Sequence, residues 1–191
     1  MNNISNISYY QPRKDDKFFF DTNIWIYLYY PLGNYNKNII SKYSNFLKQI
    51  LKNQSRVFIS SIVLSEFINT YVRLEFNILK KKYPNKILDF KKDFRGTKKY
   101  RNVISDIKIT LKRQILKFTQ RIDDKFNKMD IDELLLDLEN SDFNDNYYIC
   151  LCEIENLKIV THDKDFKSKA TNILILTANS KLLMTCVEKK S

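Results

Sequence analysis

Short apolar runs and longer segments with helical periodicity alternate along the chain. A helix packed on one side repeats apolar residues every three to four positions, whereas a strand of a covered parallel sheet is a continuous apolar run. These patterns predict strands at residues 18–20, 56–60, 158–161 and 172–176. They predict helices over residues 24–30, 36–53, 61–83, 103–126 and 145–155. Strands that alternate with helices indicate an α/β protein with a mostly parallel central sheet.

The first predicted strand ends abruptly on an acid. In "KFFFDTNIW" the apolar run stops at Asp21, and Thr22 and Asn23 follow before the apolar pattern resumes. Asp163 lies in a similar place, beyond the strand "KIV". Open parallel sheets bind ligands outside the carboxyl ends of their strands, so both acids belong at the binding edge. A lone Asp in such a place is more simply a helix N-cap, but its recurrence at two junctions weakens that alternative.

Two further acids join this group from predicted helices. Glu66 lies in the second turn of a helix that begins near Ser61, its expected cap, and borders the apolar stripe of that helix. Asp145 opens the helix "DNYYICLCEI", and Asp142 lies three residues earlier. Carboxylates brought together stay ionised only near a cation or with raised pKa values. An oxygen-only ligand set suits Mg²⁺ or Mn²⁺, and such ions activate water for attack on a phosphodiester.

The charge of the chain adds an independent indication. Its 191 residues include 33 Lys and Arg against 22 Asp and Glu, which gives a net charge of +11 and a pI near 9.4. Such a surface attracts polyanions, of which nucleic acid is the commonest. The alternative is a solvated lysine-rich surface. For the basic runs at residues 80–82 and 98–101 we favour solvated faces, with a nucleic-acid contact as the alternative.

Several other classes of protein lack their signatures here. With two Gly residues, the chain has neither a P-loop nor a dinucleotide-binding fingerprint. Its single histidine, His162, excludes two-histidine catalysis, and we expect its side chain to be exposed. Cys150, Cys152 and Cys186 form no zinc motif and are expected to be reduced, buried residues of a cytoplasmic protein. The chain shows no leader-like segment and no run of about 18 apolar residues, so we expect no membrane association.

These motifs together resemble the PIN-domain ribonucleases, the fold of the VapC toxins. That family opens on a strand ending in D-[ST]-[NS], here "FFFDTNIWIYLYY", and continues to a helix with S-x-x-x-x-E, here "ISSIVLSEF". It closes on an acidic helix and a strand followed by D-x-D-F, here "DNYYICLCEIENLKIVTHDKDF". The resemblance covers roughly residues 17–71 and 142–185. The chain departs from the family in a long gap between Glu66 and Asp145, and in bulky "YYICLC" where the family has small residues.

The resemblance implies a PIN-like three-layer α/β/α fold and a metal-binding acidic quartet. The quartet consists of Asp21, Glu66, Asp145 and Asp163, and would hold one or two Mg²⁺ or Mn²⁺ ions. Asp21 and Asp145 are the expected direct ligands, and Asp163 would bind directly or through water. Glu66 would orient water or a second ion. A water activated at this site would cleave RNA.

Five neighbouring residues complete the expected site. Thr22, Asn23 and Thr161 would support the ligands by hydrogen bonds. Asp142 and Asp165 are secondary candidates. For Asp142 we favour a helix N-cap, and for Asp165 a position on the surface.

The expected organisation is a single PIN-like domain over residues 17–185. A flexible N-terminal arm would precede it over residues 1–16, and a tail would follow over residues 186–191. A helical insertion over about residues 84–135 would form an arm, a clamp or a dimer contact.

The expected function is a metal-dependent endoribonuclease in the cytoplasm, with RNA as its substrate. Because a free ribonuclease would harm its host, we expect it to be a toxin held in check by an antitoxin protein, and a homodimer is a further expectation. A catalytically inactive PIN-like module that binds RNA or protein is the first alternative. An α/β binding module whose acids are only helix caps is the second.

Overall fold

The computed structural model describes residues 3–87, 89–139, 141–168 and 171–184, and its centre is a six-stranded, all-parallel sheet. The strands lie in the order β1-β6-β5-β2-β3-β4, and each neighbouring pair is parallel. Their bounds are β1 Asn3–Asn6, β2 Lys17–Phe20, β3 Arg56–Ile59, β4 Thr119–Arg121, β5 Lys158–Val160 and β6 Leu174–Thr177. The expected strands are therefore present, within one or two residues at their ends.

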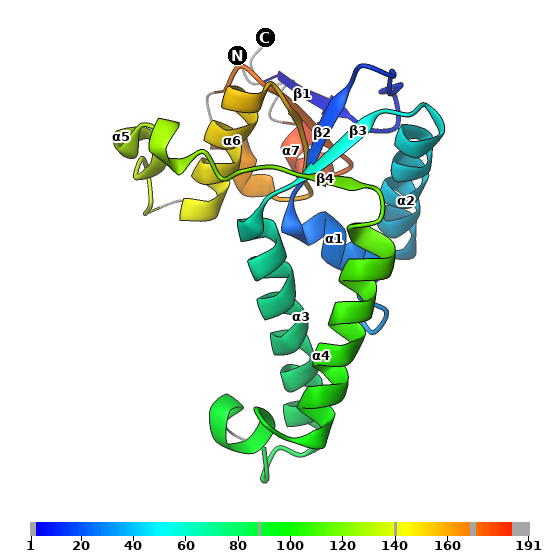
Figure 1. Cartoon of the computed structure of the whole chain (residues 1–191), viewed down its shortest axis with the longest axis vertical. Helices are drawn as coiled ribbons and strands as arrows, with labels where there is room; N and C mark the ends of the chain where they lie inside the picture. The colour runs from blue at the N-terminus through cyan, green and yellow to red at the C-terminus, as the bar shows by residue number, and fades with distance from the viewer. Residues whose placement is uncertain (1–2, 88, 140, 169–170, 185–191) are drawn as a thin grey trace.

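Helices lie on both sides of this sheet, which confirms the three-layer α/β/α arrangement (Figure 1). Their bounds are α1 Thr22–Tyr29, α2 Lys37–Lys52, α3 Ser61–Lys82, α4 Lys98–Thr110, α5 Ile131–Leu134, α6 Phe143–Glu155 and α7 Ser180–Met184. Within the described residues, no helix combines the length and apolar composition that crossing a membrane requires.

Strand β2 is apolar throughout because both faces of the sheet are covered at its centre. Phe18 packs edge-on against Phe46 of α2, with ring centroids 5.6 Å apart. Phe19 points to the opposite face and packs against Tyr148 of α6 at 5.2 Å. All three Phe side chains of the strand are fully buried. This packing places the carboxyl end of β2 at a set position between the helix layers.

The N-terminal segment is part of the sheet, so the prediction of a flexible arm over residues 1–16 is wrong for residues 3–16. Strand β1 pairs with β6, from Asn3 opposite Leu174 to Asn6 opposite Thr177. Ile7 is 3% exposed, and Tyr10 packs its ring against the core. The sequence hides this strand because "NISN" is a polar edge strand without an apolar run. The predicted tail over residues 186–191 lies outside the described residues.

The predicted middle insertion is also only partly helical. The expected helix over residues 103–126 ends at Thr110, and after a π-helical turn the chain enters strand β4. Strand β4 pairs with β3, with Thr119 opposite Val57 and Arg121 opposite Ile59. Pairing with the open edge of the sheet overrides the local helical periodicity.

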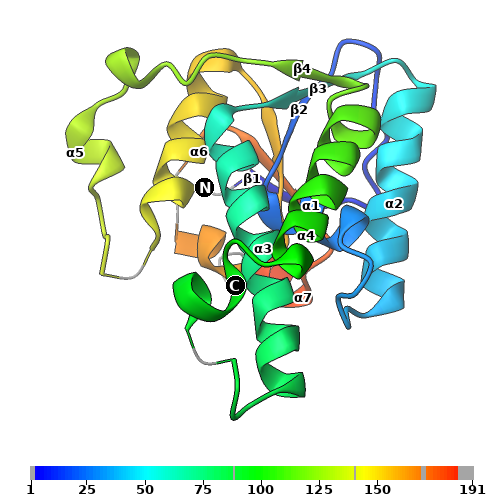
Figure 2. The same cartoon turned by 60° about the horizontal axis from the view of Figure 1, so that its bottom comes forward.

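Helices α3 and α4 extend side by side beyond the sheet and form an arm (Figures 1 and 2). The loop between them, with a π-helical turn at Phe90–Phe94, lies at the far end of this arm. Helix α3 begins at the edge of the sheet and continues to the tip of the arm, so a single helix connects the two regions.

Two of the three cysteines can be assigned. Cys150 and Cys152 are buried free thiols on α6, as expected. Burial raises the pKa of both thiols, which keeps them protonated and unreactive. Cys186 lies outside the described residues.

We expect Ile7→Ala to lower the free energy of unfolding by about 2–4 kcal/mol, because it removes a buried side chain next to the β1–β6 pairing. Urea unfolding measures this change. Tyr9→Ala is the matched control, since Tyr9 is 86% exposed, and should change stability by less than about 0.5 kcal/mol. Equal, small effects of both substitutions would support a loose N-terminal arm instead.

Candidate active site

Asp21 lies at the end of β2 and at the N-cap of α1, with its carboxylate almost completely buried. Its backbone N–H donates to the carbonyl oxygen of Val160, which ties it to the end of β5. Its carboxylate accepts hydrogen bonds from Thr161 Oγ1 at 2.6 Å and from the side-chain amide of Asn23 at 2.5 Å. The cap bond to the backbone N–H of Asn23 is longer, at 3.4 Å. Asp21 therefore caps the helix, but its strongest contacts are with these two side chains.

Thr161 and Asn23 connect the ends of β2 and β5. Asn23 Nδ2 donates to Thr161 Oγ1 at 3.2 Å, and Thr161 Oγ1 also accepts from the backbone N–H of Asp163 at 3.0 Å. Asn23 Oδ1 accepts from the backbone N–H of His162 at 3.2 Å. Two of the three predicted supporting residues, Asn23 and Thr161, thus hold Asp21 and the backbone of Asp163 in one hydrogen-bonded group.

The prediction of an exposed His162 side chain is wrong. The ring is half-buried and packs edge-on against Tyr27 and Tyr43. Its Nδ1 lies 2.9 Å from the hydroxyl of Tyr43. Burial lowers the pKa of this imidazole, while the charge of Asp163 partly opposes that effect. The residue therefore packs behind the site.

Glu66 lies in the second turn of α3, and three hydrogen-bond donors hold its carboxylate. Thr22 Oγ1 donates at 2.8 Å, and Tyr148 and Asn144 of α6 donate through their side chains. Burial and the bond to Glu66 raise the pKa of the Tyr148 hydroxyl, so it remains a donor at any physiological pH. Glu66 thus connects α1, α3 and α6 beneath the cleft.

Sequence reasoning missed Tyr148 and Asn144. A signal was available for Tyr148, because residues three positions apart lie on the same side of a helix and Asp145 was already a candidate. The choice of Glu66 as their acceptor depends on how α3 and α6 pack, which spacing within α6 does not reveal.

These acids line one cleft of about 340 Å³. Asp21, Glu66, Asp145 and Asp163 all contribute to it, from the ends of β2 and β5 and from α3 and α6. Its other lining residues are Thr22, Asn23, Ile26, Tyr27, Tyr35, Thr70, Asp142, Asn144 and Tyr148. The structure therefore brings the four predicted acids to one cavity.

The two secondary candidates differ in position. Asp142 lines the cleft and occupies the N-cap position of α6, as favoured, although its side chain makes no cap hydrogen bond. Asp165 is half-buried rather than on the open surface, and it does not line the cleft. Its backbone N–H donates to Asp163 Oδ1 at 2.9 Å, so it contributes to the position of Asp163.

A larger hollow of about 540 Å³ lies at the ends of β3 and β4, lined by residues that include Ser61, Arg121 and Asp123. It holds no group of acids like that of the cleft. Ser61 donates to Asp124 at 2.6 Å, and Ser60 is the residue that caps α3. The expectation that Ser61 caps this helix is therefore wrong by one position.

Burial and neighbouring acids both disfavour the ionised form of Asp21, and burial is the larger effect. Burial raises its pKa from the usual 3.8 to about 7, and the charges of Glu66 and Asp163 add to that rise. The hydrogen bonds from Thr161 and Asn23 oppose it. A cation at this position would favour the ionised form and relieve the repulsion.

The donor chemistry of the cleft fits a hard divalent cation, since its acids offer only oxygen atoms. In the part of the chain that is described, no three acidic side chains yet lie close enough to surround one ion. Three donors already hold the Glu66 carboxylate, whereas the half-buried side chains of Asp145 and Asp163 line the cleft beside Asp21. Asp21, Asp145 and Asp163 are therefore the residues that could hold an ion.

Comparison with known families agrees with this geometry. A family model of the PIN domain matches residues 18–172, and the chain belongs to that family. One similar solved structure is that of VapBC2 from Rickettsia felis bound to a DNA fragment from their promoter. It is 22% identical with a TM-score of 0.53, over 85% of this chain and 99% of that chain.

A second similar structure is PAE2754 from Pyrobaculum aerophilum. It is 13% identical with a TM-score of 0.45, over 98% of both chains. A search of curated proteins found no match.

We expect Asp21→Asn to stabilise the metal-free protein at pH 8 by roughly 2–4 kcal/mol and to have little effect near pH 4. Because the folded-state pKa is raised, the folded protein binds more protons between pH 4 and 7, and its stability falls as the pH rises through this range. Chemical unfolding in EDTA at the two pH values measures the difference.

Asp16→Asn, at the other end of β2, is the control with the opposite sign. Burial alone would raise the pKa of Asp16, but hydrogen bonds from the Arg13 backbone, Lys158 and Tyr10 lower it. Its ionised form therefore stabilises the fold above about pH 4, and this substitution should destabilise the protein at pH 8. A pH-independent effect of Asp21→Asn would contradict the raised pKa.

Proposed function

We propose that this protein is a divalent-metal-dependent endoribonuclease that hydrolyses RNA phosphodiester bonds, and that it is the toxin of a toxin–antitoxin pair in the cytoplasm. One observation carries the proposal: four acids from separate elements line one cleft at the carboxyl ends of β2 and β5. Membership of the PIN-domain family supports it, since PIN domains are generally nucleases. The net charge of +11 supports a polyanionic substrate.

In this proposal three of the acids hold the ion and the fourth orients the attacking water. A bound Mg²⁺ or Mn²⁺ would lower the pKa of a water and neutralise charge on the phosphate. Asp21, Asp145 and Asp163 would hold the ion, and Thr161 and Asn23 would keep the Asp21 carboxylate oriented. Glu66, held by Thr22, Tyr148 and Asn144, would orient the attacking water.

The antitoxin belongs to the proposal for two reasons. An uncontrolled ribonuclease would damage the cell that makes it, so a protein that blocks the cleft is expected. The similar structure from Rickettsia felis is of a protein pair, VapBC2. A homodimer remains a prediction.

An inactive PIN-like module that binds RNA or protein is the alternative. The hydrogen bonds that occupy Glu66, and the absence of three converged acids among the described residues, favour it. A module without catalysis would have no need of four carboxylates at one cleft, where bringing like charges together costs free energy. For this reason we prefer the endoribonuclease to the inactive module.

We expect the purified protein to cleave RNA in the presence of Mg²⁺ or Mn²⁺. Cleavage should stop when EDTA chelates the ion. Asp21→Asn should lower the cleavage rate by at least about 100-fold, because it removes a ligand charge at the site. Gel analysis of a labelled RNA measures the rate. Asp15→Asn changes an exposed acid outside the cleft and should retain full activity. Tight RNA binding without cleavage in either ion would establish the inactive module.

We expect Tyr148→Phe to lower the cleavage rate by about 10- to 100-fold and to raise the Mn²⁺ concentration needed for half-maximal rate. The substitution removes a donor that positions Glu66 without removing an acid. Tyr147→Phe is the matched control, because the Tyr147 hydroxyl donates to the backbone carbonyl of Asp124, outside the cleft. If both variants show the same Mn²⁺ dependence as the unchanged chain, Tyr148 has no positioning role.

A further inference from the structure

The positive charge of the chain is concentrated at the tip of the arm. Residues 80–101 contain ten of the 33 Lys and Arg and two of the 22 Asp and Glu, which places +8 of the net +11 on 22 residues. All ten basic residues are exposed. The remaining 169 residues carry only +3. The charge that attracts a polyanion therefore lies mostly outside the body that holds the sheet.

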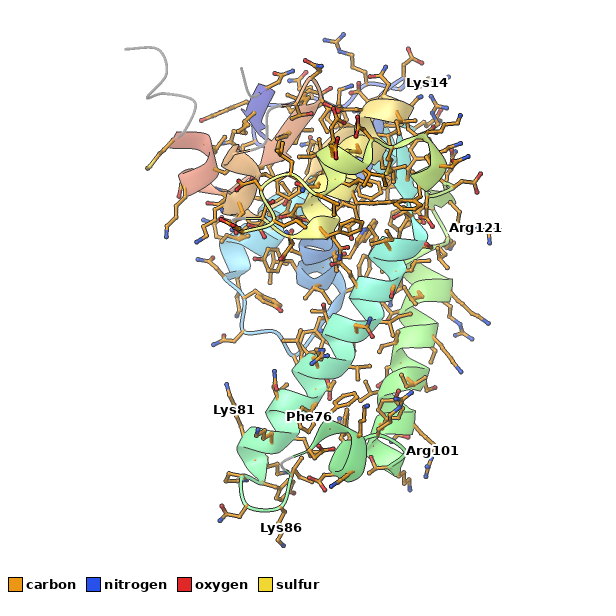
Figure 3. All side chains as sticks on the ribbon, turned by 90° about the vertical axis from the view of Figure 1, so that its left-hand side faces the viewer. Lys14, Phe76, Lys81, Lys86, Arg101 and Arg121 are labelled. Carbon is orange, nitrogen blue, oxygen red and sulfur yellow. The ribbon has the colours of Figure 1, made fainter. Side chains whose placement is uncertain are left out.

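The tip is a folded unit, so its charges have set positions. The ring centroids of Phe76 of α3 and of Phe90 and Phe94 of the π-helical turn lie 5.4–5.8 Å apart, and Tyr100 of α4 packs against Phe94 at 5.5 Å. Figure 3 shows Phe76 between the two helices, with Lys81 and Arg101 on opposite sides of the arm and Lys86 at its end. The aromatic cluster forms the interior of the tip, and the basic side chains lie on its surface.

The two acids of residues 80–101 are too few to balance their ten basic residues. The carboxylate of Asp89 accepts from the backbone N–H of Lys92, and that of Asp93 accepts from the backbone N–H of Asp89. Both carboxylates thus accept hydrogen bonds from backbone N–H groups of the π-helical turn and of its N-cap residue. Lys99 pairs with Glu75 at 2.9 Å, on the side where α3 and α4 meet.

One side of α3 leads from the cleft to this tip. Glu66 and Thr70 line the cleft, and helical spacing continues the same side through Arg73 and Asn77 to Lys80 and Lys81. The last four of these residues are exposed. Lys81 lies 15 residues after Glu66, which is roughly 22 Å along the axis at 1.5 Å per residue. A basic stripe, Arg73, Lys80 and Lys81, therefore starts beside the cleft and ends at the tip.

We infer that this basic stripe holds the phosphates of an RNA strand whose scissile bond lies in the acidic cleft. The inference rests on the proposed function and specifies its substrate as a long RNA, since roughly six stacked nucleotides at about 3.4 Å each span the 22 Å. Lys and Arg are the usual phosphate contacts, whereas the cores of protein interfaces are depleted in Lys. Composition therefore favours RNA over a protein partner on this stripe.

The test compares two triple variants that each remove three positive charges, both made in the Asp21→Asn background so that bound RNA is not cut. The stripe variant is Arg73→Gln, Lys80→Gln and Lys81→Gln. The matched control is Arg101→Gln, Lys98→Gln and Lys108→Gln, which removes the same residue types from the exposed side of α4 opposite its buried Val103. Circular dichroism checks that both variants remain folded.

Binding is measured by fluorescence anisotropy over a range of salt concentrations, with an RNA of about 20 nucleotides and one of about four, too short to span the stripe. We expect the stripe variant to bind the long RNA at least about tenfold more weakly and to reduce the slope of log affinity against log salt by about 2. Its preference for long over short RNA should largely disappear. The control variant should bind the long RNA within about twofold of the parent.

Equal loss of RNA affinity in both variants would show that binding depends only on total charge. No loss of affinity in either variant would show that the arm does not bind RNA. Both outcomes overturn the inference. A change in mass by light scattering in the stripe variant, with RNA affinity retained, would assign the stripe to a second copy of the chain and also overturns it. Metal-dependent cleavage by the chain with Asp21 intact tests the proposed function separately. RNA binding by the stripe can therefore be refuted without refuting the proposed nuclease activity, and the nuclease activity can be refuted without refuting RNA binding by the stripe.

Discussion

The burial of one carboxylate, Asp21, at the end of the central strand is the constraint on which the site depends. Strand β2 is covered on both faces, so its carboxyl end opens directly onto the cleft between the helix layers. Burial and neighbouring acids raise the pKa of Asp21 to about 7, and Thr161 and Asn23 restrain it. A carboxylate at this position disfavours the folded state when it is ionised, and carboxylates with raised pKa values are common at functional sites.

Glu66 links the helices that surround the cleft. Its carboxylate is held by donors from α1 and α6, so it joins the elements around the cleft as well as contributing to its charge. The same helix continues to the tip of the arm, where most of the positive charge lies. Helix α3 therefore connects an acidic site that would bind a cation with a basic surface that would bind a polyanion. A rigid helix keeps the distance between the two constant, which suits a substrate that must contact both.

The charge of the molecule is segregated in a way that its overall value conceals. A net charge of +11 suggests a uniformly basic surface, yet the body around the sheet is nearly balanced and +8 lies on residues 80–101. The described residues that line the cleft include five acids and no Lys or Arg, so the cleft itself offers no positive side chain to a phosphate. Binding by the arm would therefore have to offset the repulsion between an RNA backbone and the acids, unless a cation compensates them.

The apolar strands could be predicted from sequence, because burial on both faces of a parallel sheet imposes a continuous apolar run. The four acids could be predicted from their positions after strands and at the beginnings of helices, and from the motif order that resembles the PIN-domain family. Strands β1 and β4 could not, since "NISN" is polar and "TQR" lies within a helical periodicity, and both become strands by pairing with an open sheet edge. The partners of Glu66 likewise depend on how α3 meets α6. The sequence by itself determined which acids are available to line the cleft. Only the tertiary structure decided which groups hold them and where the arm lies, because contacts between distant segments follow from packing and not from neighbouring residues.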